Sequence, residues 1–231
     1  MGQPAAGSME SLYPFLYSGT SDLAAVLEQV RQSTVAKAAE ITELRRVFAA
    51  RDGARLSACA ADAAARFAAG GRLLAFGNGG SATDAQQLAA LFLNPGGTVS
   101  ASTGPAGPVR PLPALGLASD TSVITALCND IGVDVVFARQ IAAFGRRDDI
   151  AVGLSTSGNS ENLLRGLTEA GRRGMLTVGI AGYQGGQMAE LDGLDYLFVA
   201  PSSSVHRIQE AQTTIYHALW ELTLAALGEG G

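Results

Sequence analysis

Short apolar runs alternate along the chain with longer segments in which apolar residues recur every three or four positions. Short runs of this kind are typical of buried strands, and the longer pattern is typical of helices. Because helical segments separate the runs, we expect parallel strands with helices on both faces of the sheet. The pattern predicts an α/β fold, a doubly wound five-stranded parallel sheet flanked by helices. Strands are predicted near residues 72–77, 113–118, 149–155, 176–181 and 195–200.

The N-terminal part of the chain lacks this alternation and carries only the helical spacing, as in Val26, Leu27 and Val30. The chain is expected to form one domain over residues 1–231. Its predicted parts are an extension over 1–19, a helical segment over 20–68 and an α/β core over 70–228. Helices are predicted within residues 20–50, over 53–68 and from Ser204 to Leu227.

Hydroxyl side chains gather where the strand predicted at 149–155 passes into the next helix. Free backbone N–H groups at a helix N-terminus, together with the helix dipole, attract negative charge. One N-cap needs only one hydroxyl, so a cluster of four favours a phosphate site over simple capping. The four residues are Ser155, Thr156, Ser157 and Ser160.

A second loop of this kind follows the strand predicted at 72–77. It runs through Asn78, Gly79 and Gly80 to Ser81, and its glycines let a ligand approach the backbone closely. Its glycine spacing matches neither the dinucleotide fingerprint nor a P-loop, so no nucleotide cofactor is expected. Ligands of doubly wound sheets bind outside the carboxyl ends of the strands, where both loops lie.

Composition limits the classes of partner that this chain is expected to bind. The chain has 231 residues, of which 47% are hydrophobic and 16% charged, and its net charge is −5. This balance gives no basic footprint for nucleic acid. The sequence shows no long apolar run and no charged-then-apolar N-terminus, so neither a membrane partner nor secretion is expected, and the expected location is cytoplasmic.

Five motifs, taken in order, resemble the SIS (sugar isomerase) domain family of the sedoheptulose-7-phosphate isomerase, or phosphoheptose isomerase, type. The resemblance covers about residues 20–228 and implies a phosphosugar ligand, carbohydrate metabolism and a homotetramer built through the segment 20–68. The motifs are Gly77–Ser81, Asn129–Asp130, Ser155–Ser160, Gly182–Gly186 and Arg207–Glu210.

The resemblance also implies roles for individual residues. The phosphate is expected on Ser81, Ser155, Thr156, Ser157 and Ser160, and the rest of the substrate on Asn78, Gly79, Asp130 and Gln209. Isomerisation needs a side chain of a type that titrates near neutrality, and His217 is the candidate by its residue type alone. Glu210 or a water molecule is the candidate for the second acid or base.

The departure from the family concerns zinc. The family implies an ion held partly by residues that align with Gln209 and His217, completed by a His and a Glu on the helix after the glycine loop. Here those two positions are Gln87 and Leu91. Two amides and one imidazole are a poor donor set, because zinc prefers Cys, His and carboxylate ligands. Gln209 and His217 stay the candidate zinc residues, and less than stoichiometric zinc is expected.

Two functions follow from these observations. The preferred one is aldose–ketose isomerisation of sedoheptulose 7-phosphate or a similar sugar phosphate, by an enzyme of the intramolecular oxidoreductase class. The alternative is a non-catalytic phosphosugar-binding sensor or adaptor of the same fold. The loop Pro95–Pro111, rich in Gly, Pro and Ser, has two interpretations, a mobile surface loop, which is preferred, and a lid over the site.

Overall fold

The computed structural model describes residues 23–95 and 110–229. The predicted extension 1–19 lies outside the described residues, as does most of the predicted loop Pro95–Pro111. None of the helices within the described ranges has the length and apolar character needed to cross a membrane. The elements are α2 (Leu23–Ala68), β1 (Leu73–Gly77), α3 (Gly80–Leu93), β2 (Ala114–Gly116), α4 (Thr121–Asp130), η2 (Val133–Val135), α5 (Val136–Phe144), β3 (Ile150–Leu154), α6 (Glu161–Arg172), β4 (Leu176–Gly182), η3 (Gly186–Glu190), β5 (Tyr196–Ala200) and α7 (Val205–Glu229).

The five strands form one parallel sheet in the order β2-β1-β3-β4-β5, which confirms the predicted fold class. The central strands β1, β3 and β4 are buried along their whole length and, apart from Thr177 in β4, carry no polar side chain, as expected for strands covered on both faces. In the register, Gly77 pairs with Leu154, and Leu154 pairs with Ile180. The carboxyl ends of these three strands therefore meet at one edge of the sheet.

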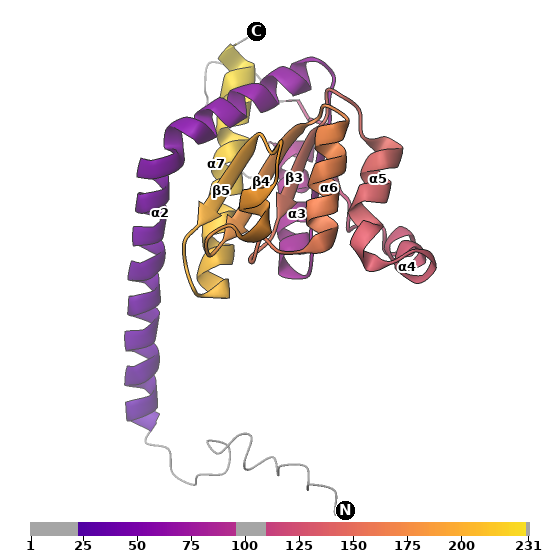
Figure 1. The fold of residues 1–231 in the computed structure, drawn as a ribbon. Coiled ribbons are helices and arrows are strands. Elements are labelled where there is room, and N and C mark those ends of the chain that lie inside the picture. The colour runs from indigo at the N-terminus through magenta and orange to yellow at the C-terminus, as the bar shows by residue number, and fades with distance from the viewer. Residues whose placement is uncertain (1–22, 96–109, 230–231) are drawn as a thin grey trace, which may run out of the picture. The chain divides into compact units, whose positions relative to one another are not determined.

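Two hydrophobic cores cover the two faces of the sheet, because successive strand side chains point to opposite faces. Leu73 and Ala75 pack in one core with α3, α7 and the second half of α2. Leu74 and Phe76 pack in the other core with α5 and α6. Figure 1 shows α6 and α5 on the near face of the sheet and α3 and α7 behind it. The helices that carry the candidate site residues are thus anchored on both faces.

The prediction of two N-terminal helices is wrong, because α2 is one continuous helix through Gly53. A glycine in a helix interior costs only about 1 kcal/mol relative to alanine, and the alanine-rich surroundings favour the helix. The chain divides into two compact units, Met1–Thr42 and Glu43–Gly231. The described part of the first unit is the beginning of α2, and the second unit contains the sheet and every candidate site residue.

Candidate functional site

The glycine loop and the serine loop lie side by side at the carboxyl edge of the sheet. They follow β1 and β3 directly, and those neighbouring strands are in register to their last residues. The side chain of Asn78, in the glycine loop, exchanges two hydrogen bonds with Asn162 in the first turn of α6, at 2.8 and 2.9 Å. Ser81 is buried in the first turn of α3. The structure therefore brings together the two loops that the sequence predicts to hold phosphate.

The serine loop folds around its own hydroxyls. Ser155 Oγ accepts a hydrogen bond from Gly158 N at 3.0 Å and lies 3.4 Å from Ser160 Oγ. Ser157 Oγ accepts one from Asn159 N at 3.2 Å. Ser160 is the N-cap residue of α6, yet its hydroxyl makes no capping hydrogen bond. The loop thus leaves a hydroxyl at a helix N-terminus that capping does not use, next to backbone N–H groups suited to an anion.

The turn after β4 fixes the shape of the serine loop. Gly158 has φ +69°, and a Cβ atom there would lie 1.9 Å from the carbonyl oxygen of Gly185. Met188 N donates to the Gly158 carbonyl at 2.9 Å, and Gln187 N donates to Asn159 Oδ1 at 2.8 Å. The serine loop is therefore clamped from outside by a second loop, and only glycine fits at the point of contact.

We expect Gly158→Ala to lower the free energy of unfolding by more than about 3 kcal/mol, well above the roughly 1–2 kcal/mol of a left-handed residue alone. The excess comes from the clash with Gly185. Gly193→Ala is the matched control, since Gly193 has φ +78° but a Cβ there would meet no atom within 4 Å. Urea unfolding of both variants measures the difference, and equal losses would contradict the clamp.

Gln209, on α7, reaches the glycine loop. A Cβ atom on Gly80 would lie 2.3 Å from Gln209 Nε2, so the amide rests directly on the backbone of that loop. Gly79, next to it, has φ +55°. Three predicted substrate residues, Asn78, Gly79 and Gln209, thus lie around one loop.

Gln212 was not among the predicted site residues. Its side chain is fully buried, and its Nε2 donates to the carbonyl oxygens of Ser155 and Ile180 at 2.9 and 3.1 Å. Its Oε1 has no hydrogen-bond partner among the described residues. The bond to Ser155 ties α7 to the first residue of the serine loop, so the helix that carries Gln209 and His217 is fixed relative to that loop.

Two predicted acids, Glu210 and Asp130, interact with neighbours on their own helices rather than with the two loops. Glu210 forms an ion pair with Arg207 one turn before it on α7. Asp130, at the end of α4, accepts a hydrogen bond from the neighbouring Asn129 at 2.8 Å. In residues 23–95 and 110–229, no hydrogen bond joins either acid to the glycine or serine loop. Their predicted roles in catalysis and substrate binding stay predictions.

His217 lies among aromatic rings. Its ring stacks on that of Tyr216 at 5.1 Å between centroids and lies in a T-shaped arrangement with that of Trp220 at 6.3 Å between centroids. The Tyr216 hydroxyl donates to Asp84 Oδ1 on α3, at 3.5 Å. Burial raises the pKa of the Asp84 carboxyl, and the hydrogen bond from Tyr216 opposes that shift. The Asp84–Tyr216 contact links α3 to the part of α7 that carries His217.

The residues present do not fit a zinc ion of the family's kind. Leu91 is 2% exposed and lies in the same hydrophobic cluster as Tyr216 and Trp220, where a ligating carboxylate would otherwise be. Gln87, on the same side of α3, is exposed and offers only an amide. The described part of the chain brings no three His, Cys, Asp or Glu side chains into one group able to hold a metal. Amide oxygens are weak substitutes for the ligands that zinc prefers.

Comparison with known proteins places this chain in a family. The family described as the SIS domain matches residues 38–182, more than half of the chain. The phosphoheptose isomerase of Desulfovibrio desulfuricans is 45% identical over 188 residues, which cover 81% of this chain and 84% of that protein. That of Nitratidesulfovibrio vulgaris (strain Hildenborough) is 40% identical over 196 residues, covering 85% of this chain and 89% of that protein.

Solved structures of phosphoheptose isomerases are also similar to this chain. The phosphoheptose isomerase of Neisseria gonorrhoeae superposes with a TM-score of 0.70 at 34% identity, over 83% of this chain and 97% of that one. The phosphoheptose isomerase of Francisella tularensis superposes with a TM-score of 0.68 at 30% identity, over 88% of this chain and 98% of that one. This chain is therefore similar to each of the two solved structures in sequence and in fold, over most of its length and most of theirs. The chain belongs to the SIS domain family, and within it to the phosphoheptose isomerase type.

Proposed function

We propose that the protein is a phosphosugar isomerase that interconverts an aldose and a ketose phosphate, with sedoheptulose 7-phosphate or a close relative as substrate. The observation that carries the proposal is the pair of loops at the carboxyl edge of β1 and β3, joined by Asn78 and Asn162. The relatives named as phosphoheptose isomerases support the same substrate class.

The phosphate is proposed to bind in the serine loop at the N-terminus of α6. There the helix dipole, the backbone N–H groups and the hydroxyls of Ser157 and Ser160 all favour an anion. Ser81, at the first turn of α3, would complete the cradle from the neighbouring loop. The sugar would then extend toward Gln209, which rests on the glycine loop.

The chemistry needs a base that removes the proton from the carbon beside the carbonyl, and an acid that returns it to the neighbouring carbon of the enediolate. His217 is the proposed acid/base, because imidazole titrates near neutral pH. Glu210 is proposed as the second group, and its carboxylate pairs with Arg207 one turn before it on α7. The donor set does not suit zinc, so no step of this proposal uses a metal ion.

A second candidate function is phosphosugar binding without turnover. It is favoured by Leu91, which is buried in an apolar cluster at the position where the family has an acid. Such a protein would keep the serine and glycine loops and lack the second acid/base. It would act as a sensor or an adaptor.

Incubation with sedoheptulose 7-phosphate, followed by chromatographic analysis of aldose phosphate, decides between the two functions. The isomerase proposal expects product in proportion to enzyme and its loss in His217→Ala. Binding without product would favour the sensor. Failure of the phosphate to bind at all would remove both proposals.

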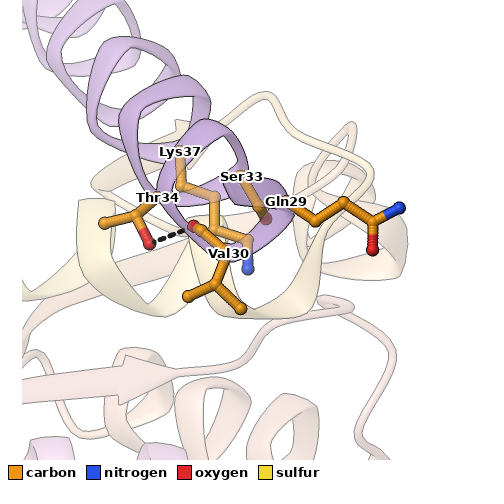
Figure 2. Close-up of a pocket in the computed structure, with 5 residues that line it drawn as sticks. All are labelled: Gln29, Val30, Ser33, Thr34 and Lys37. Carbon is orange, nitrogen blue, oxygen red and sulfur yellow. Dashed lines mark hydrogen bonds between the residues drawn. The ribbon is translucent and has the colours of Figure 1, made fainter. Parts of the chain in front are cut away.

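We further propose a cytoplasmic homotetramer assembled through α2. The early part of this helix exposes apolar side chains, since Val26, Leu27 and Val30 are 41%, 60% and 57% exposed. Figure 2 shows that Val30 shares a hollow on the helix with four polar residues, and that the Thr34 hydroxyl donates to the Val30 carbonyl at 2.8 Å. Because this hydroxyl is already hydrogen-bonded, burying it against another copy would carry little penalty.

Light scattering at micromolar concentration is expected to return the mass of a tetramer, and Leu27→Glu with Val30→Glu to return a smaller one, because the charges would be buried between copies. Ala36→Glu with Ala39→Glu is the matched control. It adds the same charge on the opposite side of the same helix and should keep the tetramer. A monomeric wild-type protein, or equal effects of both pairs, would refute this assembly.

A further inference from the structure

One pair of side chains joins the two loops of the proposed site. Asn78 follows β1, and Asn162 lies 84 residues later in the first turn of α6. Asn78 Nδ2 donates to Asn162 Oδ1 at 2.8 Å, and Asn162 Nδ2 donates to Asn78 Oδ1 at 2.9 Å. Asn162 is 6% exposed, whereas Asn78 is exposed. No other side-chain hydrogen bond joins the segment 77–82 to the segment 155–162.

A pair of side-chain amides that hydrogen-bond each other reciprocally has strict geometric requirements. Each partner must present one donor and one acceptor in the same plane, and among side chains of this size only asparagine does so. An aspartate at either position would lose one donor and would place two acceptors face to face. The pair therefore fixes both the distance and the relative orientation of the two backbone segments that carry Asn78 and Asn162.

The position of the pair gives it a consequence for binding. Ser81 is three residues beyond Asn78, and Ser160 is two residues before Asn162. Any ligand that touches both serines depends on the separation that the amides hold. The strands below set the loops side by side, but β1 ends at Gly77 and β3 at Leu154, so the backbone ladder does not reach the serines.

We propose that Asn162 is a positioning residue which, through Asn78, holds the glycine loop and the serine loop at the separation that one phosphosugar spans. This inference rests on the proposed phosphosugar function. It assigns to Asn78 the role of a clamp between loops, in place of an independent contact with the sugar.

The test is a double-mutant cycle read as the dissociation constant for sedoheptulose 7-phosphate, measured by titration calorimetry at 25 °C on the full-length protein. Asn78→Ala and Asn162→Ala should each weaken binding about tenfold, since either one removes the whole pair and its two hydrogen bonds. The double variant should be no weaker than either single variant. Asn162→Asp, which keeps the size of the side chain, should lose at least as much as Asn162→Ala.

Two further measurements separate positioning from a general loss of structure. Circular dichroism establishes that each variant is folded at 25 °C, and Asn94→Ala, at the other end of α3, is the matched control that should bind as the wild type does. The loss caused by Ser81→Ala should be at least threefold smaller in the Asn162→Ala background, because Ser81 is then no longer held within reach of the phosphate. A purely structural role of the pair would leave that loss unchanged.

Additive losses in the cycle, or unchanged affinity in Asn162→Ala, would overturn the positioning role while leaving the proposed function in place. No binding of sedoheptulose 7-phosphate to the wild-type protein would instead overturn the proposed function and this inference together. The wild-type titration therefore comes first and distinguishes the two failures.

Discussion

Replacing both Ser157 and Ser160 by alanine is expected to weaken the binding of sedoheptulose 7-phosphate by roughly 10²- to 10⁴-fold. Each hydroxyl would donate to a charged phosphate oxygen, and a hydrogen bond to a charged group contributes about 1.5–3 kcal/mol. Ser157 and Ser160 are both half-buried, so the variant should fold. Titration calorimetry of wild type and variant measures the loss.

Ser57→Ala serves as the control, because Ser57 is an exposed hydroxyl on α2. It should leave the affinity unchanged. Inorganic phosphate should show a loss of similar size in the double variant, since the removed contacts are to phosphate rather than to sugar. Unchanged affinity for both ligands would show that the serine loop does not hold the phosphate.

The second large effect concerns the altered face of α3. Gln87→His together with Leu91→Glu would place an imidazole and a carboxylate four residues apart on one helix face, and would supply the preferred types of zinc ligand. A positioned acid or base typically contributes about 10² to 10⁴ in rate. We expect the double variant to form aldose phosphate faster than the wild type by a factor in this range when zinc is supplied.

The same substitution should reduce stability without metal. Leu91 is 2% exposed inside an apolar cluster, so an unpaired carboxylate there is expected to cost about 3 kcal/mol or more. Thermal unfolding should show a lower Tm for the double variant, and zinc should raise that Tm while leaving the wild type unchanged, because a bound ion stabilises the folded state. Gln87→His alone, at an exposed position, is the control and should keep the wild-type Tm. Equal responses of wild type and double variant to zinc would contradict the argument.

Local pattern was sufficient to predict the sheet. The run predicted at 149–155 became β3, Ile150–Leu154, because a buried parallel strand must be apolar along its whole length. The polar residues at its end had to lie at the edge where ligands bind. The same local reasoning was wrong at Gly53, where the predicted break between two helices is the interior of α2. A single glycine weakens a helix without ending it when its neighbours are strong helix formers.

Contacts between distant residues could not be predicted in this way. Asn162 has the sequence context of an ordinary residue in a helix first turn, and its partner is 84 residues away. Gln212 is a polar residue on a helix that also carries exposed polar positions, and only the packed structure shows that its amide bonds Ser155, 57 residues away. The tyrosine that contacts Asp84 lies 132 residues from it. One sequence carries no signal for such pairs, because each member is unremarkable in its own segment.

The contact between Gly158 and Gly185 limits how the protein could be redesigned for another sugar. No side chain can be added at Gly158 without moving the turn after β4, so a mutant library that randomises the whole serine loop would consist largely of misfolded members. Diversity is better placed at Asp130 and Gln209, which lie outside the glycine contact and are predicted to bind the sugar rather than the phosphate. The phosphate end of the substrate would then stay constant, and selection would act on the carbon skeleton alone.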